Sequence, residues 1–509
     1  MIKQIISAVV VAAVACTALG CQKNTIPPAS AETPKELTYW TDLNGDISLF
    51  TDNQGNTEFS KELQRRTGVK LKFIHPPRSS FNLLVASKEL PDIMAYPWYE
   101  FPGGAQKAID DNIILQLNNV MEQYAPNLTA YLKENPEVDK MVKTDKGSYY
   151  VFPFIRGDER LTVSLGPVVR RDWLDQLGMK IPETMDDWYQ MLNKFKQMGV
   201  ASPLTLTPSD FGCDLFVGAY GVIMDSYIED GTVKYGPIQP QYKEFLTTMK
   251  KWYDEGLIDP YFSSNYFQKV EYNILNDKSG ATMAYLGSGM GKWLKIMEEQ
   301  GAGKSLAATP YPVLKRGEKQ KFTSQNQLYT FNNCVAITTS CKEVEAAAKF
   351  LDYGYGEEGH MLYNFGIEGV SYRMENGYPR YTDKVIQETG MTRGLANYTQ
   401  FFSGPFVQDV RYIEQYYTYP QQMEAVNTWL DNENEKYRLP LIYISDDRQD
   451  RLSQISKEVK DYVKDMLIKF IMGIEPIEKY DDYVAYIKNL GIDEMLSYQQ
   501  EALASYRNR

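Results

Sequence analysis

Strand-forming and helix-forming segments alternate over the first hundred residues, and this order constrains the fold more than any other feature. Residues 36–40, 69–74 and 90–95 have the β-rich composition of short strands. Helical patterns at 59–66 and 81–86 separate them. Strand, helix, strand, helix, strand is the order of a doubly wound α/β sheet, in which ligands bind beyond the carboxyl ends of the strands.

The rest of the chain predicts further strands and a helical C-terminus. Strand patterns at 149–154 and 161–165 flank a short polar segment, and Thr184 begins an amphipathic helix with a capping-box-like start. Apolar residues at helical spacing over 452–470 predict one long helix, and two shorter helices follow it.

The N-terminus is typical of an exported protein. A basic residue precedes an apolar run over residues 5–18, and Leu19-Gly20-Cys21 follows. We expect a signal peptide over residues 1–20, lipidation of Cys21 after cleavage, and a flexible proline-rich tether over 21–36. Two alternatives stay open: cleavage before Cys16, or an ordinary secretory signal in which Cys21 is incidental.

Composition excludes several classes of function. The 509 residues suffice for two or three domains, and the net charge of −12 leaves no basic surface that would bind nucleic acid. Only His75 and His360 are present, too few for a His-rich zinc site. After the signal peptide and its lipidated cysteine, Cys213, Cys334 and Cys341 remain. Cys334 and Cys341 could pair, but a strand-to-helix step separates them and favours buried thiols.

Several phrases of the sequence resemble the extracellular solute-binding proteins (family 1) of carbohydrate ABC importers, in their lipoprotein subgroup. These phrases span nearly the whole chain after residue 36, in the order expected of the family, and comprise residues 83–93, 169–178, 182–184, 252–260, 364–372 and 470–473.

The resemblance implies an α/β fold of the two-lobed periplasmic-binding-protein-like type (type 2), with a hinge between the lobes. We expect residues 37–155 with 285–330 to form the N-terminal lobe, and residues 156–284 with 331–509 to form the C-terminal lobe. The chain should cross between the lobes at Ile155–Arg160, near Met283–Gly287 and near Tyr329–Asn333.

The resemblance also implies function. Such a protein is not an enzyme and uses no cofactor; it captures an oligosaccharide in the interlobe cleft and delivers it, by hinge closure, to the transmembrane subunits of an ABC permease. We expect a monomer on the extracellular face of the cytoplasmic membrane, of the Gram-positive type, held there by its lipid anchor alone.

Sugar binding requires polar partners for hydroxyl groups and aromatic rings for CH faces. We expect these at strand ends and crossings, and Trp98, thought to be exposed beside prolines, is the strongest single candidate. Trp293 could instead be core, and Arg156 and Asp158 could instead form an interlobe ion pair. The candidates are Trp40, Asp42, Asn44, Tyr96, Trp98, Tyr99, Arg156, Asp158, Ser288, Trp293, Glu368 and Tyr372.

The sequence also bears on metal binding and on two alternative functions. Many relatives carry a calcium loop where this chain has residues 197–203, which lack a run of oxygen ligands, so we expect no metal there. Asp42, Asn44 and Asp46 alternate like ion ligands, but no bidentate glutamate follows, so we expect a turn or a sugar-contacting loop there. The alternatives are a binder of peptides or other polar solutes and, less favoured, a secreted glycoside-acting enzyme with carboxylates such as Asp42 and Glu368.

Overall fold

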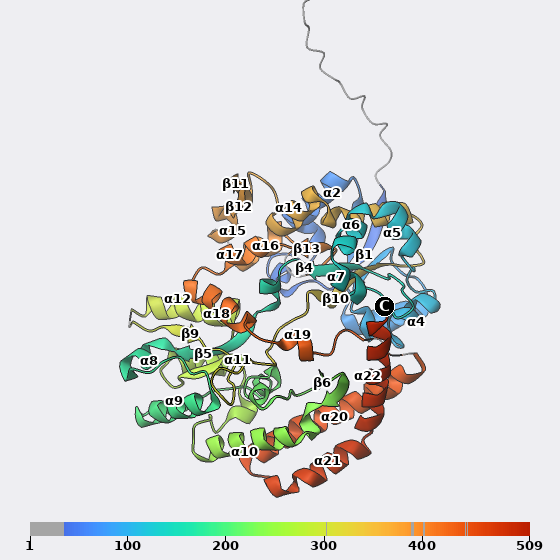
Figure 1. Cartoon of the computed structure of the whole chain (residues 1–509). Helices are drawn as coiled ribbons and strands as arrows, with labels where there is room; N and C mark the ends of the chain where they lie inside the picture. Colours follow the sequence, from blue (N-terminus) through green and yellow to red (C-terminus); the bar gives the residue numbers. More distant parts are fainter. Residues whose placement is uncertain (1–34, 302, 388–390, 401–402, 443, 445) are drawn as a thin grey trace, which may run out of the picture. The chain divides into compact units, whose positions relative to one another are not determined.

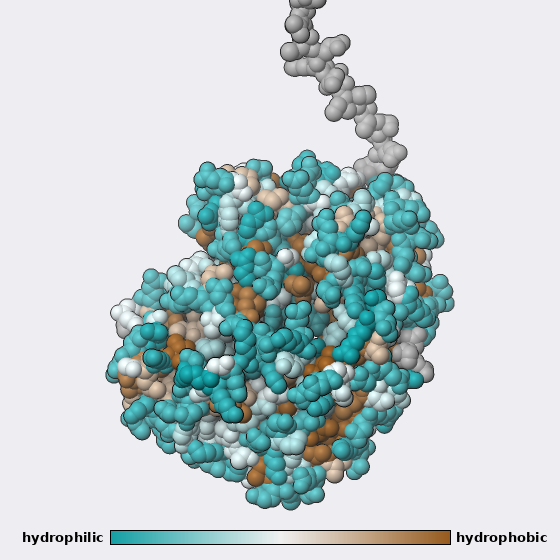
Figure 2. Space-filling view, in the orientation of Figure 1, coloured by the Kyte–Doolittle hydropathy of each residue, from teal (hydrophilic) through white to brown (hydrophobic). Residues whose placement is uncertain are grey.

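The computed structural model describes residues 35–301, 303–387, 391–400, 403–442, 444 and 446–509. The predicted signal peptide, Cys21 and most of the predicted tether lie outside the described residues. Residues Lys35–Arg509 form one compact unit. Hydrophilic residues cover most of the face of this unit that Figure 2 shows.

Within the described residues, the first half of the chain contributes to a six-stranded sheet (Figure 1). β1 pairs in parallel with both β2 and β3, as the alternating pattern predicts. β10 then lies antiparallel between β3 and β4. In spatial order the strands are β13 (Phe406–Gln408), β4 (Phe152–Arg156), β10 (Tyr329–Ile337), β3 (Ile93–Tyr96), β1 (Glu36–Trp40) and β2 (Lys70–Ile74).

Local sequence explains how the first helices begin and end. The Thr57 side chain accepts a hydrogen bond from the Ser60 amide and caps α2 (Glu58–Thr67), which ends at Gly68 in a left-handed conformation with φ 69°. α3 (Phe81–Ser87) follows β2 and leads to β3. These elements confirm the predicted strand-helix alternation.

A second, three-stranded antiparallel sheet is formed by β8 (Ala281–Tyr285), β5 (Leu165–Arg170) and β9 (Leu306–Ala308) of the described chain. The predicted strand at 161–165 is wrong, because Asp158 caps a 3-10 turn, η4 (Glu159–Thr162), and β5 begins only at Leu165. Helices α8 (Arg171–Leu177), α9 (Met185–Gln197) and α10 (Pro240–Asp254) accompany this sheet. The Thr184–Asp187 capping box predicted for α9 is present.

Two large apolar cores give the described unit its two lobes, seen in the upper and lower parts of Figure 1. The first surrounds the six-stranded sheet. The second surrounds the three-stranded sheet and includes the C-terminal helices α20 (Asp446–Met472), α21 (Tyr480–Asn489) and α22 (Ile492–Arg507). A third, smaller cluster contains Leu161, Phe365, Tyr372, Tyr381, Val385, Leu395, Tyr412 and Ile413.

Core membership differs from the predicted lobe ranges in several segments, and Phe406, Val407 and Leu441, predicted in the C-terminal lobe, pack in the first core. Residues of 286–322, including Leu306 and Phe322, pack in the second core rather than the first. Residues of 334–363 pack in the first core rather than the second. β10 inserts between β3 and β4 and carries the following helix α13 (Val344–Asp352) with it, and β13 joins the same sheet by pairing with β4.

Cys334 and Cys341 are not joined by a disulfide. Cys334 lies in β10, and Cys341 lies just beyond its end. Burial raises the pKa of both thiols to about 11, which keeps them protonated and unreactive. In the described part of the chain, no helix has the length and apolar character that a bilayer span requires.

Candidate ligand-binding site

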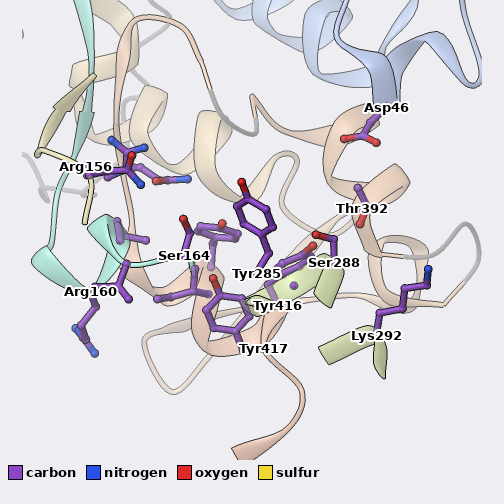
Figure 3. A pocket seen from close by; sticks show the side chains of 17 residues that line it. Asp46, Arg156, Arg160, Ser164, Tyr285, Ser288, Lys292, Thr392, Tyr416 and Tyr417 are labelled. Carbon is purple, nitrogen blue, oxygen red and sulfur yellow. The ribbon is translucent and has the colours of Figure 1, made fainter. Parts of the chain in front are cut away.

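A cavity of about 640 Å³ is lined by residues of the six-stranded sheet, of the three-stranded sheet and of the third cluster. The carboxyl end of β4 supplies Arg156, and the carboxyl end of β8 supplies Tyr285. Its walls therefore come from both lobes. The residues that line it and are labelled in Figure 3 are Asp46, Arg156, Arg160, Ser164, Tyr285, Ser288, Lys292, Thr392, Tyr416 and Tyr417.

Four tyrosines give the cavity an aromatic wall with hydroxyl groups. Tyr412 ends the turn η11 (Val410–Tyr412), and Tyr416 follows one helical turn later at the end of α17 (Ile413–Tyr416). The rings of Tyr412 and Tyr416 are 6.0 Å apart, and those of Tyr416 and Tyr417 are 5.5 Å apart. Tyr285, 50% exposed, faces them. Burial raises the pKa of Tyr285 and Tyr412, so their hydroxyls stay protonated and can donate hydrogen bonds.

Gly287 permits the Tyr416 ring to lie directly against the backbone of the segment that follows β8. A Cβ atom at position 287 would lie 2.7 Å from both Cε1 and Oη of Tyr416. Such a separation is too short for a non-bonded contact, so a side chain at 287 would displace the ring.

A polar cluster beneath η11 holds the tyrosine segment in place. Asp409 lies 2.9 Å from His360 Nε2 and accepts hydrogen bonds from the backbone and guanidinium of Arg411. The Asn364 side chain accepts from the Asp409 amide and donates to the Val407 carbonyl. Burial alone would raise the pKa of Asp409, but the bonds from His360 and Arg411 outweigh it and hold this pKa well below its usual value.

The charged groups at the predicted crossing Ile155–Arg160 do not form the ion pair between Arg156 and Asp158 that was the alternative to ligand binding. Asp158 binds Arg160, with a distance of 2.8 Å to Nη2, and Arg160 also reaches Glu414 at 3.3 Å. The hydrogen bond between them lowers the pKa of Asp158 and raises that of Arg160. Arg156 instead donates to the Gln327 carbonyl at 2.9 Å, so the proposed Arg156–Asp158 ion pair is wrong.

Comparison with known proteins identifies the family to which this architecture belongs. The family model described as bacterial extracellular solute-binding protein matches residues 53–361, more than half of the chain. The chain belongs to this family. Its members are binding proteins and not enzymes, which confirms the prediction of no catalytic activity and removes the glycoside-acting alternative.

Relatives of this solute-binding protein match over most of their length. Lipoprotein LipO of Bacillus subtilis is 23% identical over 86% of both chains. Fructooligosaccharide ABC transporter substrate-binding protein FusA of Streptococcus pneumoniae is 22% identical over 88% of this chain and 86% of FusA.

Solved structures are similar in fold. FusA in complex with kestose matches with a TM-score of 0.74 at 19% identity, covering 93% of this chain and 100% of FusA. Alginate-binding protein AlgQ2 without calcium ion matches with a TM-score of 0.73 at 23% identity, covering 92% and 98%. These likenesses confirm the two-lobed α/β fold.

Two of the predicted site residues, Arg156 and Ser288, line the cavity of this solute-binding protein. Asn44 caps α1 (Gly45–Ser48) by accepting from the Asp46 amide at 2.7 Å. Asp42 and Asn44 thus precede α1, from whose first turn Asp46, the third acidic or amide residue of the predicted loop, lines the cavity.

The predicted aromatic site after β1 and β3 forms part of the first core. Trp98 is only 1% exposed, so the expectation of an exposed Trp98 is wrong. Phe81 from α3 stacks on Tyr96 at 3.6 Å and lies against Trp98 and Trp40. The indole Nε1 atoms of Trp40 and Trp98 have no hydrogen-bond acceptor among the described residues. Tyr99 is half-exposed on η3 (Trp98–Glu100), away from the cavity lining.

The remaining predicted residues do not line the cavity. Trp293 is fully buried, stacks on Phe267 and donates to Glu271 at 2.8 Å, which agrees with the core alternative. Tyr372 packs in the third cluster, and Glu368 is exposed beside it. Asp158 binds Arg160. Whether any predicted residue contacts a ligand stays a prediction.

The segment expected to lack calcium forms a tight turn. α9 ends at Gln197, Gly199 adopts φ 91°, and the Val200 amide donates to the Phe195 carbonyl. Among the described residues, no group of three or more His, Cys, Asp or Glu is placed to hold a metal ion.

Sequence reasoning missed the tyrosines of 412–417. Their Tyr-x-x-x-Tyr-Tyr spacing is a signal that was present, because Tyr412 and Tyr416 share one helical face. The same spacing is equally common in buried helices, so it did not distinguish a cavity wall from a core.

Proposed function

We infer that this solute-binding protein is the lipid-anchored substrate-binding component of an ABC importer and captures an oligosaccharide. The observation that carries this proposal is the interlobe cavity with its wall of four tyrosines. Their rings suit the CH faces of sugar units, and their hydroxyls suit sugar hydroxyl groups. The printed functions of two relatives support a carbohydrate ligand: FusA is a fructooligosaccharide-binding protein, and YtcQ is a polygalacturonan/rhamnogalacturonan-binding protein.

The composition of the cavity walls supports the proposal of hinge closure. Arg156 belongs to the six-stranded sheet and Tyr285 to the three-stranded sheet. A ligand that contacts both walls gains more contacts when the lobes approach, so binding shifts the population toward the closed state. The closed surface would then be recognised by the transmembrane subunits of the permease.

The lipid anchor fixes the proposed location. Acylated Cys21 and a tether over residues 21–36 would hold the monomer at the extracellular face of the cytoplasmic membrane. Metabolic labelling with a radioactive fatty acid should mark the natural protein, whereas Cys21→Ser should be unlabelled and released into the medium. Equal labelling of both would contradict lipidation at Cys21.

The ligand class is tested by calorimetry of residues 35–509 against oligosaccharides and peptides. We expect an oligosaccharide to bind, and Tyr416→Ala to weaken it by about tenfold or more through loss of ring contact. Tyr261→Ala, which truncates a tyrosine 69% exposed and outside the cavity lining, is the control. Binding of peptides but no oligosaccharide would favour the peptide-binding alternative.

A further inference from the structure

Three cationic side chains of the described residues line the cavity, and two of them are neutralised within the protein. Arg160 is paired with Asp158 and Glu414, as described above. The Lys292 ammonium lies 2.8 Å and 2.9 Å from the two carboxylate oxygens of Glu271. Neither cation therefore needs a charged partner from a ligand.

Arg156 differs from the other two. Its guanidinium donates to one acceptor, the Gln327 carbonyl, and lies 5.8 Å from the centre of the Phe154 ring. Among the described residues, no carboxylate lies within ion-pair distance of it. A guanidinium has five N–H groups, and one hydrogen bond uses one of them. Most N–H groups of Arg156 therefore have no acceptor in the described chain. Burial lowers the pKa of Arg156, yet arginine stays charged at neutral pH.

The backbone fixes Arg156 at this position. Arg156 is the last residue of β4, which pairs with β10 through Ile155 and Tyr329 and with β13 through Arg156 and Gln408. The side chain thus extends into the cavity from a strand held on both sides. Figure 3 shows it on the cavity wall, apart from Lys292 and at the opposite end from Asp46.

A partly desolvated cation without a counter-ion is costly, and an anion brought by the ligand would offset that cost. The planar guanidinium fork matches a carboxylate, which can accept two parallel hydrogen bonds. We propose that the oligosaccharide bound by this protein is acidic, and that Arg156 binds the carboxylate of one of its uronate units. This inference rests on the proposed oligosaccharide-binding function. Asp46 disfavours a second carboxylate at its own end of the cavity.

The test compares uronate oligosaccharides of two to four units with the same oligosaccharides after reduction of their carboxyl groups. Calorimetry of the wild-type protein should show at least one uronate oligosaccharide bound about tenfold or more tightly than its reduced form. Arg156→Gln should lower affinity for that uronate ligand by about thirtyfold, and should change affinity for the reduced form by less than about threefold. Arg156→Lys should retain part of the preference, because it keeps the charge and loses the fork.

Arg373→Gln is the matched control, because it removes the same charge from a side chain 65% exposed and outside the cavity lining. It should leave both affinities unchanged, and thermal unfolding should confirm that each variant is folded.

Equal or tighter binding of the reduced oligosaccharides would overturn the acidic ligand while leaving oligosaccharide binding intact. Loss of preference in Arg373→Gln as large as in Arg156→Gln would overturn a direct contact. Binding of no oligosaccharide would overturn both proposals.

Discussion

At the residue scale, the cavity depends on the missing side chain of Gly287. Because a Cβ there would lie 2.7 Å from the Tyr416 ring, Gly287→Ala should rotate Tyr416 away from its place in the wall. We expect about tenfold weaker ligand binding and a loss of about 1 kcal/mol in the free energy of unfolding. Calorimetry and urea unfolding measure the two. Gly212→Ala has open space around its Cβ and should change neither; unchanged affinity in Gly287→Ala would contradict the role given to this glycine.

At the scale of elements, the segment from β13 to α17 is held by Asp409, whose carboxylate is bound by His360 and Arg411. Asp409→Ala should lower the free energy of unfolding at pH 7 by about 2 kcal/mol, because it removes charge-assisted bonds and leaves their donors unpaired. Ligand affinity should fall with it, since Tyr412 and Tyr416 follow directly.

The pKa of Asp409 gives this effect a pH dependence. Its pKa is depressed in the folded state, so its contribution is fully present above the unfolded value of about 3.9 and is lost as pH falls through the folded pKa. The stability difference between wild type and Asp409→Ala should therefore shrink as pH falls below about 4. A difference that grows below pH 4 would contradict this assignment.

The elements also show which parts of the fold could be predicted from the sequence. Strands such as β1 and β2 were predictable because short β-rich runs between turn residues and helical patterns have few other interpretations. The position of β10 was not predictable, because its partners β3 and β4 lie far away along the chain. The burial of Trp98 was unpredictable for the same reason. Phe81, from α3, packs against Trp98, and the residues next to Trp98 in sequence do not indicate this contact. Arg156 and Ser288 were found because strand ends are a topological property of the fold.

At the scale of the whole described unit, one side chain ties the two lobes together away from the ligand cavity. Arg509 follows α22, which packs in the second core through Ile492 and Met495. Its guanidinium pairs with Asp145 and donates to the Lys143 carbonyl at 2.9 Å, next to α7 (Pro136–Met141) of the first lobe. The side chain is only 5% exposed. The proposed closure of the lobes would therefore pivot at this contact or break it.

Arg509→Ala should remove this link, because the ion pair and the carbonyl bonds share one guanidinium. We expect a loss of about 2 kcal/mol in the free energy of unfolding and faster hydrogen exchange in residues 140–146 and at the end of α22. Arg451→Ala is the control: Arg451 is bound to Glu494 at 3.4 Å within the second lobe and is half-exposed, so its loss should cost less than about 0.5 kcal/mol. If both variants lose equal stability and exchange in 140–146 stays slow, Arg509 does not couple the lobes.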